Sequence, residues 1–218
     1  MSNKLLQYLL SNNPDDVLSK KGIKVRRFFN PLFRKVMMLS TSGKLIVKQK
    51  ADIPDDKRII YACTHGFRDD IIFSMKTIDK HVYLLYGSLL DFYESSHGYG
   101  LWANGVIIVD RKDKDSRKAS INKMKRAIEL GADIIMFPEG TWNKNQNMAV
   151  QKLYPGIYDV AKDTNALIAP VATVLNGDKC YSMMGDAFDI TDLSIESYLE
   201  ILKLQIKKNK KSKRYNLV

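Results

Sequence analysis

Cysteine and histidine are scarce in this sequence of 218 residues, which contains two cysteines and three histidines. Cys63 and Cys180 show no metal-ligand spacing, and two cysteines do not make a disulfide framework. We therefore expect no metal site, and we expect the protein to reside in a reducing compartment.

Long apolar runs are also missing. The longest, such as Gly105–Val109, have the length of a strand and fall far short of the roughly 18 apolar residues that a transmembrane helix needs. The first ten residues lack a long apolar stretch and a small-residue cleavage site, so a signal peptide is not expected. With 45% hydrophobic and 10% aromatic residues the chain can still form a core, which excludes global disorder, and its length fits one domain.

The net charge of +11 is unevenly distributed along the chain. The segments Lys20–Lys35 and Lys203–Arg214 each carry seven basic residues and no acid, which leaves 21 basic against 24 acidic residues elsewhere. Something anionic is therefore expected at these two segments, and an anionic membrane surface or an acidic acyl carrier protein would suit them. A nucleic-acid-binding protein is the non-enzyme alternative that this charge suggests. Nucleic acid is nevertheless not expected as a partner, because the lysine run has no interleaved aromatic residues and no recognisable binding module.

The middle of the chain alternates strand and helix patterns, which predicts an α/β fold with a mixed, largely parallel central sheet flanked by helices. We expect a single domain: an N-terminal amphipathic, basic helical segment over residues 1–45, the α/β domain over 46–190, and a C-terminal helix with a basic tail over 191–218. The expected strands are residues 58–63, 82–86, 106–109, 134–137 and 167–174, and the expected helices are residues 116–130, 157–163 and 195–208. Residues 106–137 form a predicted βαβ unit with parallel strands.

Apolar residues between Val25 and Met37 recur at helical spacing. Asn30-Pro31 is expected to divide this region into two helices, with Asn30 as the N-cap and Pro31 in the first turn. Two interpretations stay open: a helix packed on the domain, or an interfacial helix that places its apolar residues in lipid. The residues that would enter lipid are Phe28, Phe29, Leu32 and Phe33.

Three polar clusters directly follow three predicted strands: residues 64–70, 110–111 and 138–141. Because ligands of open α/β sheets bind at the carboxyl ends of the strands, we expect these clusters to converge on one site. In the first cluster, Asp69 or Asp70 would begin a helix, and Asp70 could hold one nitrogen of His65 and leave the other as a base. His81 and His97 are interpreted as ordinary surface histidines.

Four sequence blocks occur in order: His65-x₄-Asp70, Gly105–Arg111, Phe137–Thr141 and Ile168–Val171. In order and spacing they resemble the four blocks of the glycerolipid acyltransferases, the lysophosphatidic acid acyltransferase (PlsC-like) family. The resemblance covers about residues 45–185. It implies an O-acyltransferase of phospholipid synthesis that moves a fatty acyl group from an acyl thioester, acyl-CoA or acyl carrier protein, to 1-acyl-glycerol-3-phosphate.

The resemblance also implies roles for individual residues. His65 would be the general base, Asp70 its orienting partner, and Arg111 the residue that meets the acceptor phosphate. The acceptor pocket would be lined by Glu139, Gly140 and Thr141, and Pro170 would lie near the acyl donor. No cofactor beyond the thioester co-substrate is implied, and the enzyme is expected to be cytoplasmic and peripheral on the inner face of the membrane.

The sequence departs from the family pattern at Trp142, where many members carry a basic residue. Arg68 is a candidate for supplying the missing phosphate-binding charge. The acceptor could instead be another lysolipid or a non-lipid hydroxyl, and the same His–Asp pair acting on water would make a thioesterase-like hydrolase. Glu139 has an alternative role as an N-cap or structural acid.

Overall fold

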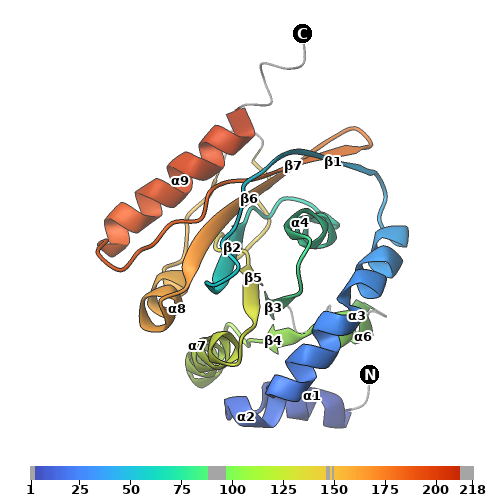
Figure 1. Ribbon diagram of the computed structural model, residues 1–218, viewed down its shortest axis with the longest axis vertical. Coiled ribbons are helices and arrows are strands. Elements are labelled where there is room, and N and C mark those ends of the chain that lie inside the picture. Colours follow the sequence, from blue (N-terminus) through green and yellow to red (C-terminus); the bar gives the residue numbers. More distant parts are fainter. Residues whose placement is uncertain (1–2, 88–96, 146–147, 149, 212–218) are drawn as a thin grey trace.

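One sheet organises the chain in the computed structural model, which describes residues 3–87, 97–145, 148 and 150–211 (Figure 1). Its strands lie in the order β1-β7-β6-β2-β5-β3-β4, and only the β6–β7 pair is antiparallel. The predicted mixed, largely parallel sheet is therefore confirmed. The strands are β1 (Lys44–Lys50), β2 (Ile59–Cys63), β3 (Val82–Tyr86), β4 (Val106–Ile108), β5 (Asp133–Met136), β6 (Leu167–Asn176) and β7 (Lys179–Met184).

Helices cover both faces of the sheet. In Figure 1, α7, α8 and α9 lie on one side of the central strands, and α4 lies on the other side together with α3 and α6. The helices are α1 (Asn3–Leu10), α2 (Pro14–Val17), α3 (Lys20–Leu39), α4 (Asp70–Ile78), α6 (His97–Asn104), α7 (Lys114–Glu129), α8 (Gly156–Thr164) and α9 (Ile195–Lys211). The end of the predicted basic tail, residues 212–218, lies outside the described residues.

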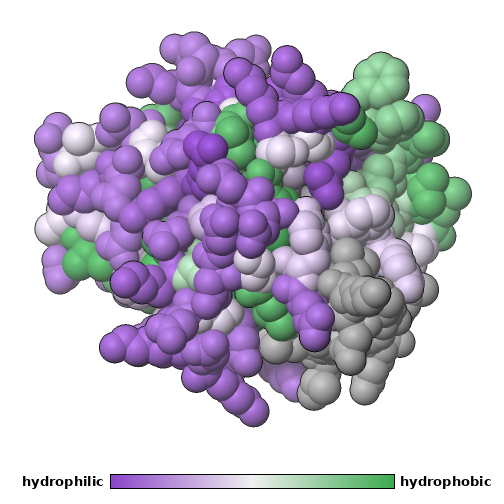
Figure 2. All heavy atoms as spheres, turned by 90° about the horizontal axis from the view of Figure 1, so that it is seen from below, coloured by the Kyte–Doolittle hydropathy of each residue, from purple (hydrophilic) through white to green (hydrophobic). Residues whose placement is uncertain are grey.

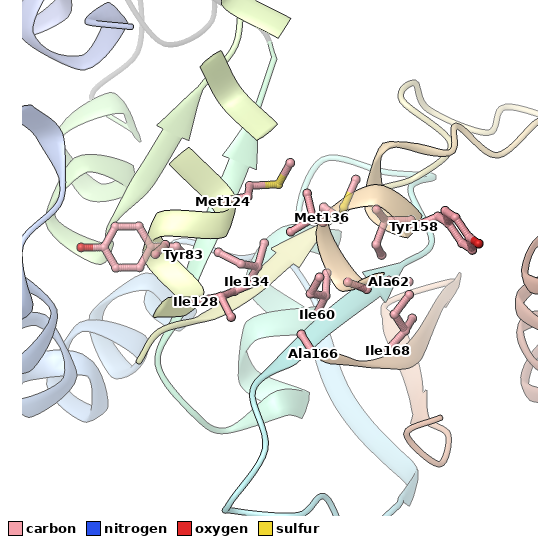
Figure 3. Close-up of a cluster of buried hydrophobic side chains, with 14 of the residues drawn as sticks. Ile60, Ala62, Tyr83, Met124, Ile128, Ile134, Met136, Tyr158, Ala166 and Ile168 are labelled. Carbon is pink, nitrogen blue, oxygen red and sulfur yellow. The ribbon is translucent and has the colours of Figure 1, made fainter. Parts of the chain in front are cut away.

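The central strands are buried on both faces, so their residues alternate between two cores. Ile60 and Ala62 of β2 face the cluster beneath α7 and α8, which Figure 3 shows with Ile134 and Ile168 from the neighbouring strands. The alternate residues of β2, including Tyr61, belong to the second cluster with α4. This continuous burial explains why these strands were recognisable as short apolar runs.

The strand β3 lies between β4 and β5 and pairs in parallel with both. The predicted unit β4–α7–β5 is therefore parallel, as expected, but its two strands are not neighbours. The strands β1 and β7 were not predicted. Most of β1 is exposed at the sheet edge, so it has little apolar pattern to recognise, and β7 follows β6 after a turn at Gly177, whose φ is +59°.

The predicted break at Asn30-Pro31 is wrong, because α3 is one helix with Pro31 inside it. Asn30 does not cap a new helix: it is buried, and its Nδ2 donates to Asn104 Oδ1 of α6 at 3.3 Å. Packing of α3 against α4 and α6 offsets the main-chain hydrogen bond that a helical proline removes. Among the described residues, no helix has both the length and the apolar content to cross a bilayer.

Candidate active site

The predicted polar clusters meet at a cavity of about 600 Å³. The loops that follow β2, β4 and β5 all contribute, since the carboxyl ends of these parallel strands lie along one edge of the sheet. Five of the predicted site residues line the cavity: His65, Arg68, Arg111, Gly140 and Thr141. Asp70 and Glu139 lie behind this lining.

His65 and Asp70 form a hydrogen-bonded pair. Asp70 is fully buried as the first residue of α4, with Asp69 at the N-cap, which confirms where this helix was predicted to begin. Its Oδ2 lies 3.0 Å from His65 Nδ1 and also accepts the main-chain N–H groups of Gly66 at 2.7 Å and Phe67 at 3.1 Å. A carboxylate only accepts hydrogen bonds, so it fixes the proton on Nδ1 and leaves Nε2 as the basic nitrogen.

Aromatic side chains fix the plane of the imidazole. The ring centroid of His65 lies 4.6 Å from that of Phe137, and Trp142 approaches edge-on at 5.9 Å. Trp142, where the family pattern led us to expect a basic residue, is also part of the cavity lining. At this position the protein therefore has a ring contact to the candidate base instead of the expected charge.

Glu139 holds the loops together from behind the site. Its side chain belongs to a residue that is only 2% exposed, and it does not line the cavity. Its Oε1 accepts the N–H of His65 at 3.2 Å, and its Oε2 accepts the N–H of Gln151 at 2.9 Å. In the same region, the N–H of Asn143 donates to the carbonyl of His65 at 2.6 Å. These contacts favour the interpretation of Glu139 as a structural acid, and its role in binding acceptor stays a prediction.

Arg111 reaches across the cavity to the turn after β5. Its Nη1 donates to the carbonyl of Gly140, whose φ of +67° favours glycine at this turn. Gly87, at the end of β3, lets Arg111 pass: a Cβ there would lie 2.1 Å from Arg111 Nε. Among the described residues, Arg111 forms no ion pair, so its charge is available to an anionic group.

Arg68 is committed to a different partner. Its side chain is 68% exposed, and its Nε donates to Asp69 Oδ1 at 2.8 Å. Burial raises the pKa of Asp69, but hydrogen bonds from Arg68 and Ser42 outweigh it and hold that pKa below its usual value. Lys144 also lines the cavity, two residues after Trp142, and adds a cation that sequence reasoning missed.

The remaining wall of the cavity is apolar. Sequence reasoning did not find these residues, because they come from elements that are distant in the chain. They are Met37 of α3, Ile71 and Ile72 of α4, Leu84 and Leu85 of β3, and Leu101 of α6. The cavity thus has a charged side beside His65 and an apolar side beneath α3, and this division suits an amphiphilic substrate.

The arrangement places a hydrogen-bonded His–Asp pair beside cations on one side and an apolar wall on the other. Comparison with known proteins gives the particular family: residues 44–174 match the family described as Acyltransferase. This match spans more than half of the chain, and the chain belongs to the acyltransferase family. The resemblance predicted from the four sequence blocks is therefore confirmed.

Two further comparisons agree with this assignment. A curated 1-acyl-sn-glycerol-3-phosphate acyltransferase of Chlamydomonas reinhardtii is 24% identical over 125 residues, which cover 57% of this chain and 36% of that protein. The chain thus matches only about a third of the length of this relative. The crystal structure of the 1-acyl-sn-glycerophosphate acyltransferase PlsC from Thermotoga maritima superposes with a TM-score of 0.65 at 15% identity, covering 94% of this chain and 84% of that one. At this identity the likeness shows a shared fold.

Proposed function

We propose that this protein is a membrane-surface O-acyltransferase that moves a fatty acyl group from a thioester to the free hydroxyl of 1-acyl-glycerol-3-phosphate. The observation that carries the proposal is the His65–Asp70 pair, which opens onto a cavity that has Arg111 on one side and an apolar wall on the other. The names of the two relatives support the same acceptor.

In the proposed reaction, His65 Nε2 takes the proton of the acceptor hydroxyl as its oxygen attacks the thioester carbonyl carbon. The tetrahedral intermediate collapses with cleavage of the carbon–sulfur bond, and the imidazolium returns the proton to the departing thiolate. Asp70 stabilises the imidazolium that forms between these steps and keeps the ring in one tautomer. The products are an ester and a free thiol, so no further reactant is needed.

The acceptor is proposed to lie with its phosphate against Arg111 and Lys144 and its acyl chain along the apolar wall. A guanidinium offers two parallel N–H donors to a phosphate, and Arg111 has no competing carboxylate among the described residues. Arg68 is the weaker candidate for this contact, since its charge is already paired with Asp69.

The proposed membrane contact is the outer face of α3. Its exposed hydrophobic residues recur at helical spacing: Val25, Phe28, Phe29, Leu32, Val36 and Leu39. Figure 2 shows hydrophobic side chains gathered at the edge of the molecule on the side where α3 lies. Met37 of the same helix lines the catalytic cavity, so a lipid that enters beside α3 would meet the apolar wall directly. Phe33, also expected in lipid, is only partly exposed and lies against Gly100.

The direct test supplies the purified protein with acyl-CoA or acyl carrier protein thioesters and a panel of lysolipids, and identifies the products by mass. Transfer to 1-acyl-glycerol-3-phosphate is the expected result. Thiol release at the same rate without any acceptor would instead indicate a hydrolase. A faster reaction with a lysolipid that lacks the phosphate monoester would overturn the proposed acceptor.

A further inference from the structure

A second cavity, of about 360 Å³, lies at the amino ends of the central strands, whereas the catalytic cavity lies at their carboxyl ends. Its lining includes Arg58, which precedes β2, His81, which precedes β3, and Asp133, which begins β5. The helix α3 borders it with Arg27 and Arg34. Its volume falls in the range of small-molecule sites, which begin at roughly 300 Å³.

The wall of this cavity carries more positive than negative charge. Each of its three carboxylates has a cation: Arg34 pairs with Asp79, Lys80 with Asp55, and Arg58 with Asp133. Two more cations, Arg27 and Lys57, line the cavity and have no carboxylate within 4.0 Å in the part of the chain that the structure describes. The cavity therefore favours an anion.

Two buried polar atoms of the wall have no hydrogen-bond partner. Arg34 Nε is a donor without an acceptor, and His81 Nδ1 is likewise unpaired. The interpretation of His81 as a surface histidine is wrong, because it is buried at 6% exposure. Its Nε2 lies 2.7 Å from the carbonyl oxygen of Asn104, so Nε2 carries the proton and Nδ1 is an acceptor. Burial, with Arg27, Arg26 and Arg34 nearby, lowers the pKa of His81 to about 4, which keeps the ring neutral. Such buried groups are normally satisfied, and the described residues leave these two atoms of the wall unpaired.

We propose that this cavity binds a phosphate group. The phosphate oxygens would accept from the guanidinium of Arg27 and the ammonium of Lys57, the two cations of the wall that have no carboxylate among the described residues. His81 lines the same wall, so its ring would sense the bound group.

Two sources could present this chemistry. The first is a phospholipid headgroup, because the helix that supplies Arg27 and Arg34 to the cavity also carries the exposed Phe28 and Leu32 that are proposed to meet a bilayer. The second is a free phosphate ester in solution. The site itself does not depend on acyl transfer, since it shares no lining residue with the catalytic cavity.

The test follows the imidazole signals of the histidines by NMR while glycerol phosphate is added, with His81→Gln used to assign the His81 signal. We expect a saturable shift of the His81 signal, which persists in Arg111→Ala because that variant alters only the catalytic cavity. The double variant Arg27→Gln/Lys57→Gln should raise the dissociation constant for glycerol phosphate roughly tenfold or more, because it removes two charge-assisted contacts. The control Lys24→Gln/Lys35→Gln removes the same charge from exposed positions outside the cavity and should change it less than about twofold.

A His81 signal that does not move, or equal weakening in the two double variants, would overturn the proposal. Arg27 Nη2 also donates to the carbonyl of Gly131, so Lys57→Gln alone provides the same comparison if the double variant does not fold. Sedimentation with phosphatidylglycerol vesicles then identifies the source. A larger loss of vesicle binding in Arg27→Gln/Lys57→Gln than in the control indicates a headgroup, and equal losses with intact binding of glycerol phosphate indicate a free ester.

Discussion

Two buried carboxylates hold His65 from opposite sides. Asp70 fixes the tautomer through the ring, and Glu139 fixes the main chain through the N–H of the same residue. The sequence predicted that both acids would converge on one site with His65, and the family resemblance implied an acceptor role for Glu139, with a structural acid as the alternative. That assignment could not be refined from spacing alone, because the second partner of Glu139 is the N–H of Gln151, and a main-chain donor leaves no mark in a sequence pattern.

Replacing Glu139 by Gln distinguishes a positioning role from contact with the acceptor. The amide oxygen can keep one of the two N–H donors, while the amide NH₂ faces the other, so we expect the free energy of unfolding to fall by about 1–3 kcal/mol. The value of kcat should fall while the KM for acceptor stays nearly constant, since His65 shifts but Arg111 and the apolar wall do not. Urea unfolding and steady-state kinetics measure both. Glu196→Gln, on the exposed part of α9, is the matched control, and a selective rise in acceptor KM would show that Glu139 contacts the acceptor.

Arg111 and Arg68 can be separated by the same kind of measurement. Arg111→Ala removes a cation that has no carboxylate partner among the described residues, and we expect the acceptor KM to rise about tenfold or more with little change in the donor KM. Arg68→Ala removes an exposed charge that is already paired with Asp69, so its effect should be smaller. The reverse order of the two effects would show that Arg68 holds the phosphate.

Burial of His81 makes stability depend on pH. Its pKa is lowered to about 4 in the folded protein and is near 6.5 when unfolded, so the unfolded chain binds more protons between these values. The stabilising contribution of neutral His81 to the free energy of unfolding is therefore complete above about pH 6.5. It is lost as the pH falls toward 4, by up to about 3 kcal/mol. Burial raises the pKa of Asp133, which acts in the opposite direction, so the comparison must be with a variant. Urea unfolding of His81→Gln between pH 7 and pH 4.5 should show a smaller loss than the unaltered protein, and equal losses would contradict this account.

At the scale of elements, the strands that were predicted are the ones buried on both faces. Their apolar runs are continuous, whereas β1 lies at an edge and β7 mixes polar with apolar residues, so neither stood out. In the helix α3, by contrast, a local signal predicted a break that does not occur. Pro31 is a strong breaker by itself, but Asn30 is buried against Asn104 and the helix continues.

The exposed face of α3 can be tested as an element. Phe28→Ser/Leu32→Ser should weaken binding to anionic vesicles by roughly tenfold or more, because each large apolar side chain contributes about 1.5–3 kcal/mol on burial. Leu175→Ser/Leu204→Ser is the control, since Leu204 is 61% exposed, as Leu32 is, but lies on α9. Sedimentation with vesicles measures the effect. Equal losses in both variants would show that α3 is not the membrane-facing element.

For the whole molecule, the sheet explains why much of the site was predictable. Parallel strands bring their carboxyl ends to one edge, so polar residues after β2, β4 and β5 had to converge even though about 75 residues separate His65 from Thr141. The same rule does not predict the apolar wall, Gly87 or Lys144. These residues reach the cavity because of how the helices and loops pack, and strand order does not specify that packing. The division of the chain into residues 1–45, 46–190 and 191–218 stays a prediction.

The most direct test of the account is the rate of acyl transfer to 1-acyl-glycerol-3-phosphate by His65→Ala. Loss of the general base should lower kcat by about 10²–10⁴-fold while circular dichroism and thermal unfolding show an intact fold. Asp70→Asn should also lower kcat, because an amide no longer fixes the required tautomer, and His81→Gln serves as a control that removes a histidine outside the cavity. A folded His65→Ala protein that transfers acyl groups at the rate of the unaltered chain would contradict the account.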